Sequence, residues 1–573
     1  VCTPIARRSE PKGFPDASDV PCQQPRPHFS AWRRSLDLEG ALRVRCHVFA
    51  RSTAMSVSAE SSRPQPGNGE VARSAGRGGL AVGGAKLYFI GIGAVQQVLL
   101  PWALGLGPYG ALSSVLAAAA IVYNPVVTAS LQGVSRAVSQ ASPETEPSAL
   151  RTTFTVHSVL ALLLGALFAG LASSMGAVLN APHLVQSLRI AGGVIFLYGL
   201  YASLIGALNG RRKFTRQAGF DVVFGTLRTV LLAAGGYWMG RNFGLGVEGA
   251  MLGFVLAVAL ILGAAMGLVG IGRRGQSSVK PMEHLAFVAP LLVGQTLLNL
   301  LLQADLTLLR GFASGAALRA HLSPQAADPL VAAYRMTQLF SFLPYQLLLS
   351  VTFILFPLLA KAHHAGDRDA VARYVRTGVR VALIIAGAMV SVSSGLAGPL
   401  FRLLFPAEAA ELGTRPMQLL TLGFGAFALF GILTTVLNSL GRERASAVIT
   451  ALAFALVASL CWVLLSDAPF GAELLWRTAI STTTGLVTAT TAAAWLVYRT
   501  ARAVVAPLCF LRVGVALVLA ITVGRVLPCA TRLATVGCAA TVALLYGALL
   551  VAMREIGRPD VELIRTVIKR RPS

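Results

Sequence analysis

The sequence predicts an all-α polytopic membrane protein with about fourteen transmembrane helices: two six-helix bundles related by a parallel repeat, plus two C-terminal helices. Three observations predict it: a strongly apolar composition, apolar stretches long enough to cross a bilayer, and basic residues that gather in alternate gaps between them. The chain has 573 residues, of which 55% are hydrophobic and 13% charged, and its mean hydropathy is +0.67. Ordinary soluble domains have about 25% charged residues. The apolar composition excludes a disordered chain. With only 7 cysteines, a disulfide scaffold is also excluded.

The apolar stretches define the predicted helices in order. A bilayer-spanning helix needs about 20 mainly apolar residues. The predicted spans cover residues 82–106, 109–131, 153–179, 187–208, 219–240, 246–270, 285–309, 331–357, 378–400, 416–438, 445–466, 473–498, 508–527 and 533–553. Glycine and proline between residues 105 and 110 predict a tight turn between the first two spans.

The basic residues predict the orientation of these spans. After residue 86, one set of alternate gaps and helix ends holds 25 lysines and arginines, and the other set holds 9. Loops on the cytosolic side have the excess of basic residues. We therefore expect both termini in the cytosol. The net charge of +25 is interpreted as membrane orientation and not as nucleic-acid binding, because no basic and aromatic residues interleave.

The two ends of the chain differ from the apolar part. Residues 1–80 are rich in Pro, Ser, Arg and Gly and have no periodic apolar face. They predict a disordered or non-native N-terminal extension, with the natural start near Met55, and they lack the apolar core of a signal peptide. Residues 554–573 predict a basic cytosolic tail.

Two landmarks indicate an internal repeat. Tyr109 and Tyr334 each begin a span, and a basic residue, Arg136 or Lys361, follows 27 residues after each. Parallel repeats of this kind occur in transporters, with the substrate site between the two halves. The repeat predicts an N-terminal bundle over 81–270, a C-terminal bundle over 271–500 and two additional helices over 501–553.

Several short motifs resemble one family of membrane proteins. In chain order they are Leu104-Gly-Leu-Gly-Pro-Tyr-Gly-Ala, Val134-Ser-Arg-Ala, Ile354-Leu-Phe-Pro-Leu-Leu-Ala-Lys, Phe401-Arg-Leu-Leu-Phe-Pro and Leu437-Asn-Ser-Leu-Gly-Arg. Their order and spacing resemble the polysaccharide flippases of the multidrug/oligosaccharidyl-lipid/polysaccharide (MOP) exporter superfamily. The stretch 311–330 departs from this pattern, because it is longer than the usual link.

The resemblance implies a fold and a mode of action. It implies two six-helix bundles in a V around a central cavity that opens alternately to each side, in a bacterial cytoplasmic (inner) membrane. It also implies that the two extra C-terminal helices are associated with the lipid tail of the substrate.

Arginines inside or at the mouth of spans are the first candidates for binding an anionic substrate. Arg228 and Arg335 lie within predicted spans, where a charge costs about 3 kcal/mol or more at the helix centre. The planar guanidinium fits phosphate oxygens. The alternatives are an ion pair with Asp221 or Asp305, or a side chain that extends to the interface.

Four other residues are weaker candidates for substrate binding. Arg136 and Lys361 would frame the cytosolic entrance for a phosphate, or simply follow the positive-inside rule. Gln96 and Gln97 suit sugar hydroxyls or hydrogen bonds between helices.

Asp305 is the candidate for binding a coupling cation, Na⁺ or H⁺, and no other cofactor or metal is expected. Asn299 and Gln303 lie within one or two turns of it and would share a polar face. The alternative is a salt bridge from Asp305 to Arg310 or Arg335. Intramembrane carboxylates commonly mark ion pathways.

Three prolines are candidate hinges. Pro125, Pro344 and Pro357 interrupt the second and eighth spans, which are equivalent in the predicted repeat. Broken helices in such positions often line a substrate path.

These features predict a transporter and not an enzyme. The expected function is translocation of a polyprenyl-pyrophosphate-linked oligosaccharide for O-antigen, capsule or exopolysaccharide assembly, beside the polymerase and glycosyltransferases of the same pathway. A multidrug or cation antiporter and a lipid II flippase are the alternatives within transport, and a membrane polysaccharide polymerase or glycosyltransferase is the alternative outside it.

Overall fold

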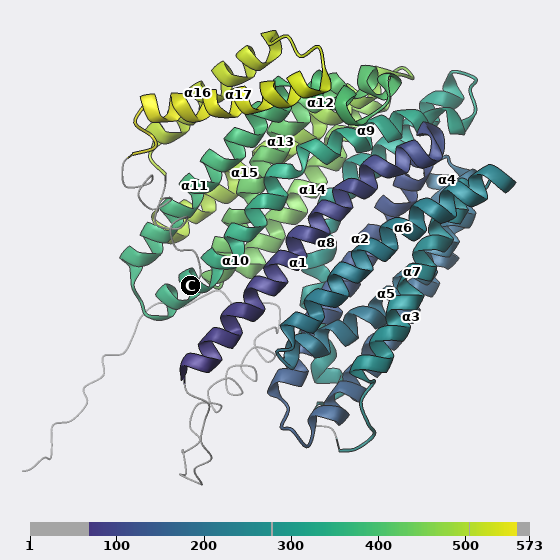
Figure 1. Ribbon diagram of the computed structural model, residues 1–573, viewed down its shortest axis with the longest axis vertical. Coiled ribbons are helices and arrows are strands. Elements are labelled where there is room, and N and C mark those ends of the chain that lie inside the picture. Colours follow the sequence, from purple (N-terminus) through teal and green to yellow (C-terminus); the bar gives the residue numbers. More distant parts are fainter. Residues whose placement is uncertain (1–67, 277–278, 504, 558–573) are drawn as a thin grey trace, which may run out of the picture. The chain divides into compact units, whose positions relative to one another are not determined.

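The computed structural model describes residues 68–276, 279–503 and 505–557, and every regular element in these ranges is a helix. The helices are α1 (Asn68–Leu104), α2 (Leu106–Gln140), α3 (Glu146–Gly170), α4 (Ala172–Val178), η1 (Pro182–Leu184), α5 (Val185–Gly210), α6 (Phe214–Phe243), α7 (Gly246–Val269), α8 (Pro281–Arg319), η2 (Pro324–Ala327), α9 (Asp328–Ser341), α10 (Leu343–His364), α11 (Arg368–Gly395), α12 (Ala397–Leu404), α13 (Ala407–Ser439), α14 (Glu443–Leu465), α15 (Ala472–Ala501), α16 (Pro507–Val526) and α17 (Arg532–Ala552). Figure 1 shows their arrangement.

The all-helical membrane fold is confirmed. Twelve helices of the described residues are long and apolar enough to cross a membrane, and each corresponds to one of the fourteen predicted spans. The other two predicted spans are also helical but are not among these twelve. Helix α15 is rich in threonine, and the predicted span 331–357 is divided between α9 and α10. The predicted extension over residues 1–80 and the start near Met55 lie mainly outside the described residues, as does most of the tail over 554–573.

Two local features of the helices follow from glycine and proline. Gly105 alone separates α1 from α2, and its φ of 84° is a conformation that glycine adopts at little cost. The expected tight turn is thus confirmed. Pro344 lies in the first turn of α10, where its missing N–H leaves no hydrogen bond unmade. By contrast, Pro125 and Pro357 lie inside continuous helices.

The stretch 311–330, expected to be a long outer loop, is largely helical. Helix α8 continues to Arg319 and η2 follows at Pro324–Ala327. The reason is local: the sequence Phe312-Ala-Ser-Gly-Ala-Ala-Leu-Arg contains three alanines and a leucine, which are strong helix formers.

The helices pack around two hydrophobic cores. One consists mainly of buried residues of α1–α7, and Met336 of α9 and Phe401 of α12 join it. The other consists mainly of residues of α8–α17. Helix α2 packs against both α8 and α9, so it is the main contact between the two groups. A Cβ on Gly110 would overlap the backbone carbonyl oxygen of Asp328, so the α2 and α9 backbones approach closely there.

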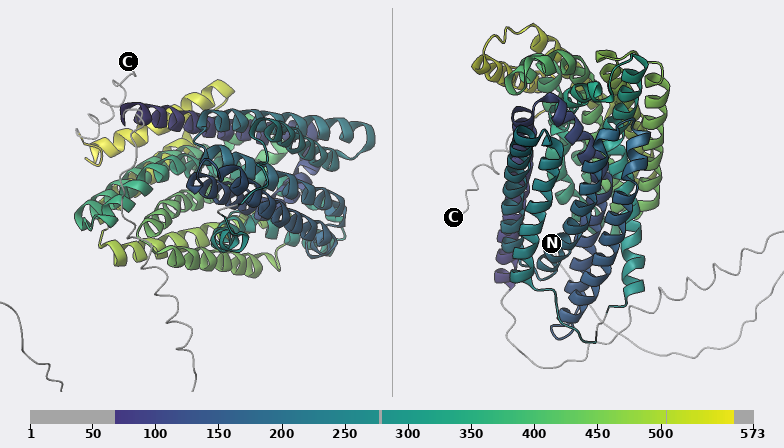
Figure 2. Two further views of the ribbon diagram at one scale, coloured as in Figure 1. Left: turned by 90° about the horizontal axis from the view of Figure 1, so that it is seen from below. Right: turned by 90° about the vertical axis from the view of Figure 1, so that its right-hand side faces the viewer.

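Helices α16 and α17 lie together against α11, at an angle to the remaining helices (Figures 1 and 2). Glu555, just after α17, connects α17 to α11 and α16. Its carboxylate accepts hydrogen bonds from Arg380 Nε of α11 at 2.9 Å and from Arg512 Nη1 of α16 at 3.2 Å. Burial works against the ionised form, but the hydrogen bonds from Arg380, Cys509 and Arg512 outweigh it and hold the pKa of Glu555 below its ordinary value.

This cluster predicts that acid loosens the C-terminal helix pair. Because the folded pKa is lowered, the stabilisation by Glu555 is present above its unfolded pKa, about 4.3, and is lost as the pH falls through the folded value. Glu555→Gln should produce the same loosening at neutral pH, with roughly tenfold faster hydrogen exchange in α16 and α17, because hydrogen bonds to charged groups contribute about 1.5–3 kcal/mol. Mass spectrometry with correction for intrinsic exchange rates measures this. Glu473→Gln, in the half-exposed Glu473–Arg477 pair, is the matched control; equal rates in the two variants would refute the prediction.

Candidate functional site

A cavity of about 310 Å³ lies between α1 and α6 on one side and α8, α9 and α10 on the other. Two arginines, Arg228 and Arg335, are the charged residues among its described lining. Five glutamines supply most of the remaining polar groups: Gln96, Gln97, Gln303, Gln338 and Gln346. The cavity thus combines positive charge with neutral hydrogen-bonding amides, and no carboxylate is among the described residues that line it.

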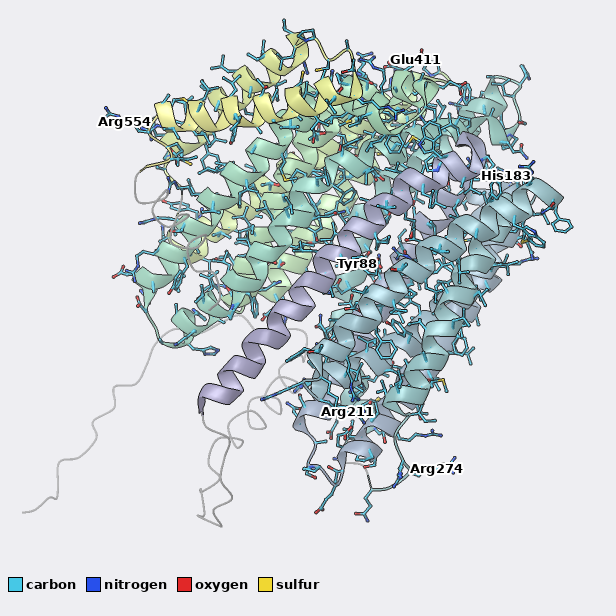
Figure 3. The ribbon with its side chains drawn as sticks, in the orientation of Figure 1. Tyr88, His183, Arg211, Arg274, Glu411 and Arg554 are labelled. Atoms are coloured by element: carbon cyan, nitrogen blue, oxygen red, sulfur yellow. The ribbon has the colours of Figure 1, made fainter. Side chains whose placement is uncertain are left out.

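The structure brings five predicted site residues together at this cavity. They are Arg228, Arg335, Gln96, Gln97 and Gln303. The other predicted residues do not line it, and their roles in binding or coupling stay predictions. Figure 3 orients the site: Arg211 and Arg274 lie at the predicted cytosolic end of the helices, His183 lies at the opposite end, and Tyr88 lies along α1 between them.

Arg228 of α6 is held by the first helix. Its Nε donates to Gln96 Oε1 at 3.1 Å, and its guanidinium carbon lies 5.0 Å from the ring centroid of Phe89. The cation–π contact and the amide leave the Nη groups for a ligand. In the part of the chain that the structure describes, Gln96 takes the place of the acidic partner that the sequence left open.

Arg335 of α9 contacts a glutamine one turn further along its own helix. Its Nη1 donates to Gln338 Oε1 at 3.0 Å. Each cavity arginine therefore has a glutamine as its partner. A neutral hydrogen-bond partner leaves more of the positive charge of the guanidinium available for an anionic ligand than an ion pair would.

Asp305 lies behind the cavity wall and is 1% exposed. It accepts hydrogen bonds from Gln338 Nε2 at 3.0 and 3.1 Å and from the Tyr334 hydroxyl at 2.9 Å. The Leu306 backbone N–H donates at 2.8 Å and Thr482 at 3.4 Å. All of these donors, in the part of the chain that the structure describes, are neutral groups.

The two arginines considered as alternative partners of Asp305 bind elsewhere. Arg310 pairs with Asp328, and Arg335 contacts Gln338. The polar face expected around Asp305 is also divided. Asn299 accepts a hydrogen bond from Asn124 Nδ2 of α2 at 2.8 Å, and Gln303 lines the cavity with its buried Oε1 unpaired in the described structure.

Tyr109 and Tyr334, the landmarks of the predicted repeat, make parallel contacts. Both are buried. The hydroxyl of Tyr109 donates to Gln97 Oε1 of α1 at 2.6 Å, and that of Tyr334 donates to Asp305 of α8. Each tyrosine thus bonds to the helix that precedes its own, and an amide in the first half stands where a carboxylate stands in the second.

Arg136 and Lys361 lie apart from the main cavity. Arg136 stacks on Phe287, with 4.0 Å from its guanidinium carbon to the ring centroid. It lines a separate pocket of about 190 Å³ between α2 and the beginning of α8. Lys361 is exposed in the last turn of α10.

The predicted extracytosolic end is joined by polar contacts. Arg310 is fully buried and pairs with Asp328 at the beginning of α9. His183 Nε2, from η1, lies 3.1 Å from Arg310 Nη2 and 3.4 Å from Asp328. Trp102 Nε1 of α1 donates to the Leu404 carbonyl of α12 at 2.9 Å. The elements of the first half and those of the second are therefore bonded together at this end.

An apolar groove of about 560 Å³ adjoins the cavity. It lies between α1 and the α9, α10 and α12 helices, and it shares the lining residues Ala94 and Leu339 with the cavity. Trp102 and Val95 in it are exposed. A polar chamber and an apolar groove thus meet along one side of α1.

Two polar contacts were not predicted from the sequence. Gln338 contacts both Arg335 and Asp305, and the only local signal was its position one helical turn after Arg335. His157 and His284 face each other with their Nε2 atoms 3.0 Å apart, which local spacing does not indicate.

Comparisons with known proteins match this architecture. The MatE family model matches residues 316–463. No curated protein matches the sequence. The structure is similar to lipid II flippase MurJ in an inward closed conformation, with a TM-score of 0.63 and 13% identity over 83% of this chain and 99% of that chain.

Two further solved structures show the same fold. One is a multidrug resistance MATE family transporter of the MOP superfamily in an inward-facing conformation (TM-score 0.57, 14% identity, 72% of this chain and 95% of that chain). The other is a MOP superfamily transporter from Pyrococcus furiosus, for which reverse polarity of the binding pocket suggests a different function (TM-score 0.51, 14% identity, 74% and 95%). The chain therefore has the fold of the MOP superfamily of membrane transporters, and its second half contains a segment that matches the MatE family.

Proposed function

We propose that this chain translocates a polyprenyl-pyrophosphate-linked oligosaccharide across a bacterial cytoplasmic membrane by alternating access, for the assembly of a surface polysaccharide. The observation that supports it most is the charge of the cavity. Arg228 and Arg335 enter it from helices of the two halves, and a pyrophosphate between them would bridge the halves. Arginine presents two parallel N–H groups to phosphate oxygens.

The remaining lining fits the other parts of such a substrate. The glutamine amides can donate to and accept from sugar hydroxyls. The adjoining apolar groove offers a surface for a polyprenyl tail beside the cavity, so that the tail can stay in lipid while the head group is sheltered. Each buried CH₂ group contributes about 0.8 kcal/mol, which favours a tail that remains in contact with apolar surface.

A cation at Asp305 would supply the driving force. The carboxylate is buried within the membrane-spanning helices, and its hydrogen-bond donors among the described residues are neutral. A Na⁺ ion or a proton would compensate its charge, as intramembrane carboxylates commonly require. Asp305 is therefore the proposed site of ion coupling.

The charge of the cavity disfavours a cationic drug as the substrate, because the two arginines would repel a positively charged molecule. Lipid II has the same polyprenyl-pyrophosphate chemistry, so a lipid II flippase is the second candidate. The neighbouring enzymes that would use the product are glycosyltransferases and a polysaccharide polymerase.

A deletion of the gene in its source organism tests this proposal. We expect a polyprenyl-linked oligosaccharide to accumulate on the cytosolic side and surface polysaccharide to be lost, measured by mass spectrometry of extracted lipids and by glycan staining. Plasmid-borne Arg335→Ala should fail to restore the glycan at normal protein levels. Arg274→Ala, which changes an exposed arginine outside the cavity, should restore it.

Three outcomes separate the candidates. Accumulation of lipid II with arrested cell-wall synthesis would select the lipid II flippase. Intact glycan with altered drug tolerance would select a multidrug transporter. Intact glycan, cell wall and drug tolerance would refute the proposal.

A further inference from the structure

A continuous chain of hydrogen bonds connects the cavity to the buried carboxylate. Arg335 lines the cavity and donates to Gln338 Oε1 at 3.0 Å, and Gln338 Nε2 donates to both oxygens of Asp305 at 3.0 and 3.1 Å. Gln338 itself is 1% exposed. A single side-chain amide therefore stands between the proposed anion site and the proposed cation site.

The chemistry of the two neighbours fixes the orientation of this amide. A guanidinium can only donate hydrogen bonds, and an ionised carboxylate can only accept them. The amide oxygen must therefore face Arg335, and the amide nitrogen must face Asp305. Turning the amide over would place a donor against a donor and an acceptor against an acceptor.

The other groups that face Asp305 do not reach the cavity arginine. They are the Tyr334 hydroxyl of α9, the Leu306 backbone N–H of α8 and the Thr482 hydroxyl of α15. Cys461 of α14 lies close enough to interact electrostatically with Asp305, as does the charge of Arg335. Among these, Gln338 alone has hydrogen bonds to both Arg335 and Asp305.

We propose that Gln338 is the positioning residue that couples anion binding at Arg335 to cation binding at Asp305. The inference rests on the proposed function and deepens it. When a pyrophosphate draws the guanidinium of Arg335 to itself, Gln338 loses its partner on the cavity side and its amide is free to rotate. Asp305 then loses a donor and binds Na⁺ or H⁺ more tightly.

Linkage makes this coupling measurable from either side. If the anion raises the affinity for the cation by some factor, the cation raises the affinity for the anion by the same factor. The full chain, purified in lipid nanodiscs, is titrated with farnesyl pyrophosphate as the probe. Binding is measured with and without about 100 mM Na⁺ at about pH 8, and without Na⁺ at about pH 5.5. The ionic strength is held constant, because salt screens the attraction between the probe and the arginines. Asp305→Asn gives the baseline that comes from titration of the probe itself.

We expect the cation to tighten binding of the probe to the wild-type chain roughly tenfold, within the usual range of coupling between sites. Gln338→Met has a similar shape and no hydrogen-bonding groups, so it should lose most of the cation dependence, down to about twofold above the baseline, whatever its affinity for the probe. Gln346→Met changes a glutamine of the same cavity and should keep the full dependence. A purely structural role of Gln338 would lower affinity equally under all conditions.

The outcomes separate this inference from the proposed function. Probe binding without cation dependence in the wild type, or an undiminished dependence in Gln338→Met, overturns the coupling role and leaves the flippase proposal standing. Absence of probe binding to the wild type overturns both. If Gln338→Met fails to fold, Gln338→Leu takes its place: it also has no hydrogen-bonding group for Arg335 or Asp305 and adds no charge, and cation dependence equal to that of the wild type would overturn the inference.

Discussion

Replacing Arg310 by alanine is expected to lower the free energy of unfolding by about 3–5 kcal/mol, because breaking a buried ion pair leaves the other charge without compensation. Arg310 is fully buried, and the Asp328 side chain is 7% exposed. His183 lies close to both, but an imidazole does not replace the five donors of a guanidinium. The titration of the purified protein from dodecyl maltoside into SDS, followed by helical circular dichroism, measures the change.

Two further variants separate the charge from the packing. Arg310→Met with Asp328→Leu removes both charges and fills a similar volume, and it should recover most of the loss, since paired apolar replacements of buried ion pairs are often neutral. Arg477→Ala breaks a partly exposed pair with Glu473 and should cost about 1 kcal/mol or less. A loss in Arg310→Ala no larger than in Arg477→Ala would contradict the prediction.

Replacing Arg228 by alanine is expected to weaken binding of farnesyl pyrophosphate roughly a hundredfold, since hydrogen bonds to charged groups contribute about 1.5–3 kcal/mol each and a guanidinium can make two to one phosphate. Arg228→Lys keeps the charge but loses the fork and one anchoring bond to Gln96. It should therefore fall between alanine and the wild type. Isothermal titration calorimetry on the purified chain in nanodiscs measures the affinities.

The control for Arg228 is Arg274→Ala, which removes the same charge outside the cavity. It should bind the probe like the wild type. If Arg228→Ala also binds with unchanged affinity while Arg335→Ala does not, only the second half contributes to anion binding. That result would remove the argument that a pyrophosphate bridges the two halves.

The transmembrane helices could be predicted because their cause is local. Within lipid every backbone N–H and C=O must be bonded inside the chain, and a run of apolar residues satisfies this as a helix. Twelve predicted spans were recovered in this way. The stretch at 311–330 was expected to be a loop because the predicted span before it ends at residue 309, while its alanines extend α8 to Arg319.

The sequence could predict several residues of the candidate site, but not which of them contact one another. Arg228 and Arg335 were singled out because an intramembrane charge is costly and needs a reason, and both line the cavity. The partner of Arg228 was not predictable, because Gln96 lies on α1 and no periodicity indicates which helix will face which. Gln338 lies one turn after Arg335 on α9, but nothing local indicates that its amide also reaches Asp305 of α8. For the same reason, Asn299 was grouped with Asp305, although the structure pairs it with Asn124 of α2.

The sequence by itself determined that this is a membrane protein, that it is helical and that its spans contain few charges. These properties depend on composition and on hydrogen bonds a few residues apart. Only the tertiary structure decided which polar groups meet. It brought two arginines to one cavity, placed Asp305 behind Gln338 and joined Arg310 to Asp328 at one end of the helices. Such contacts depend on how helices from distant parts of the chain pack, and that packing is set by the shapes of many apolar side chains together.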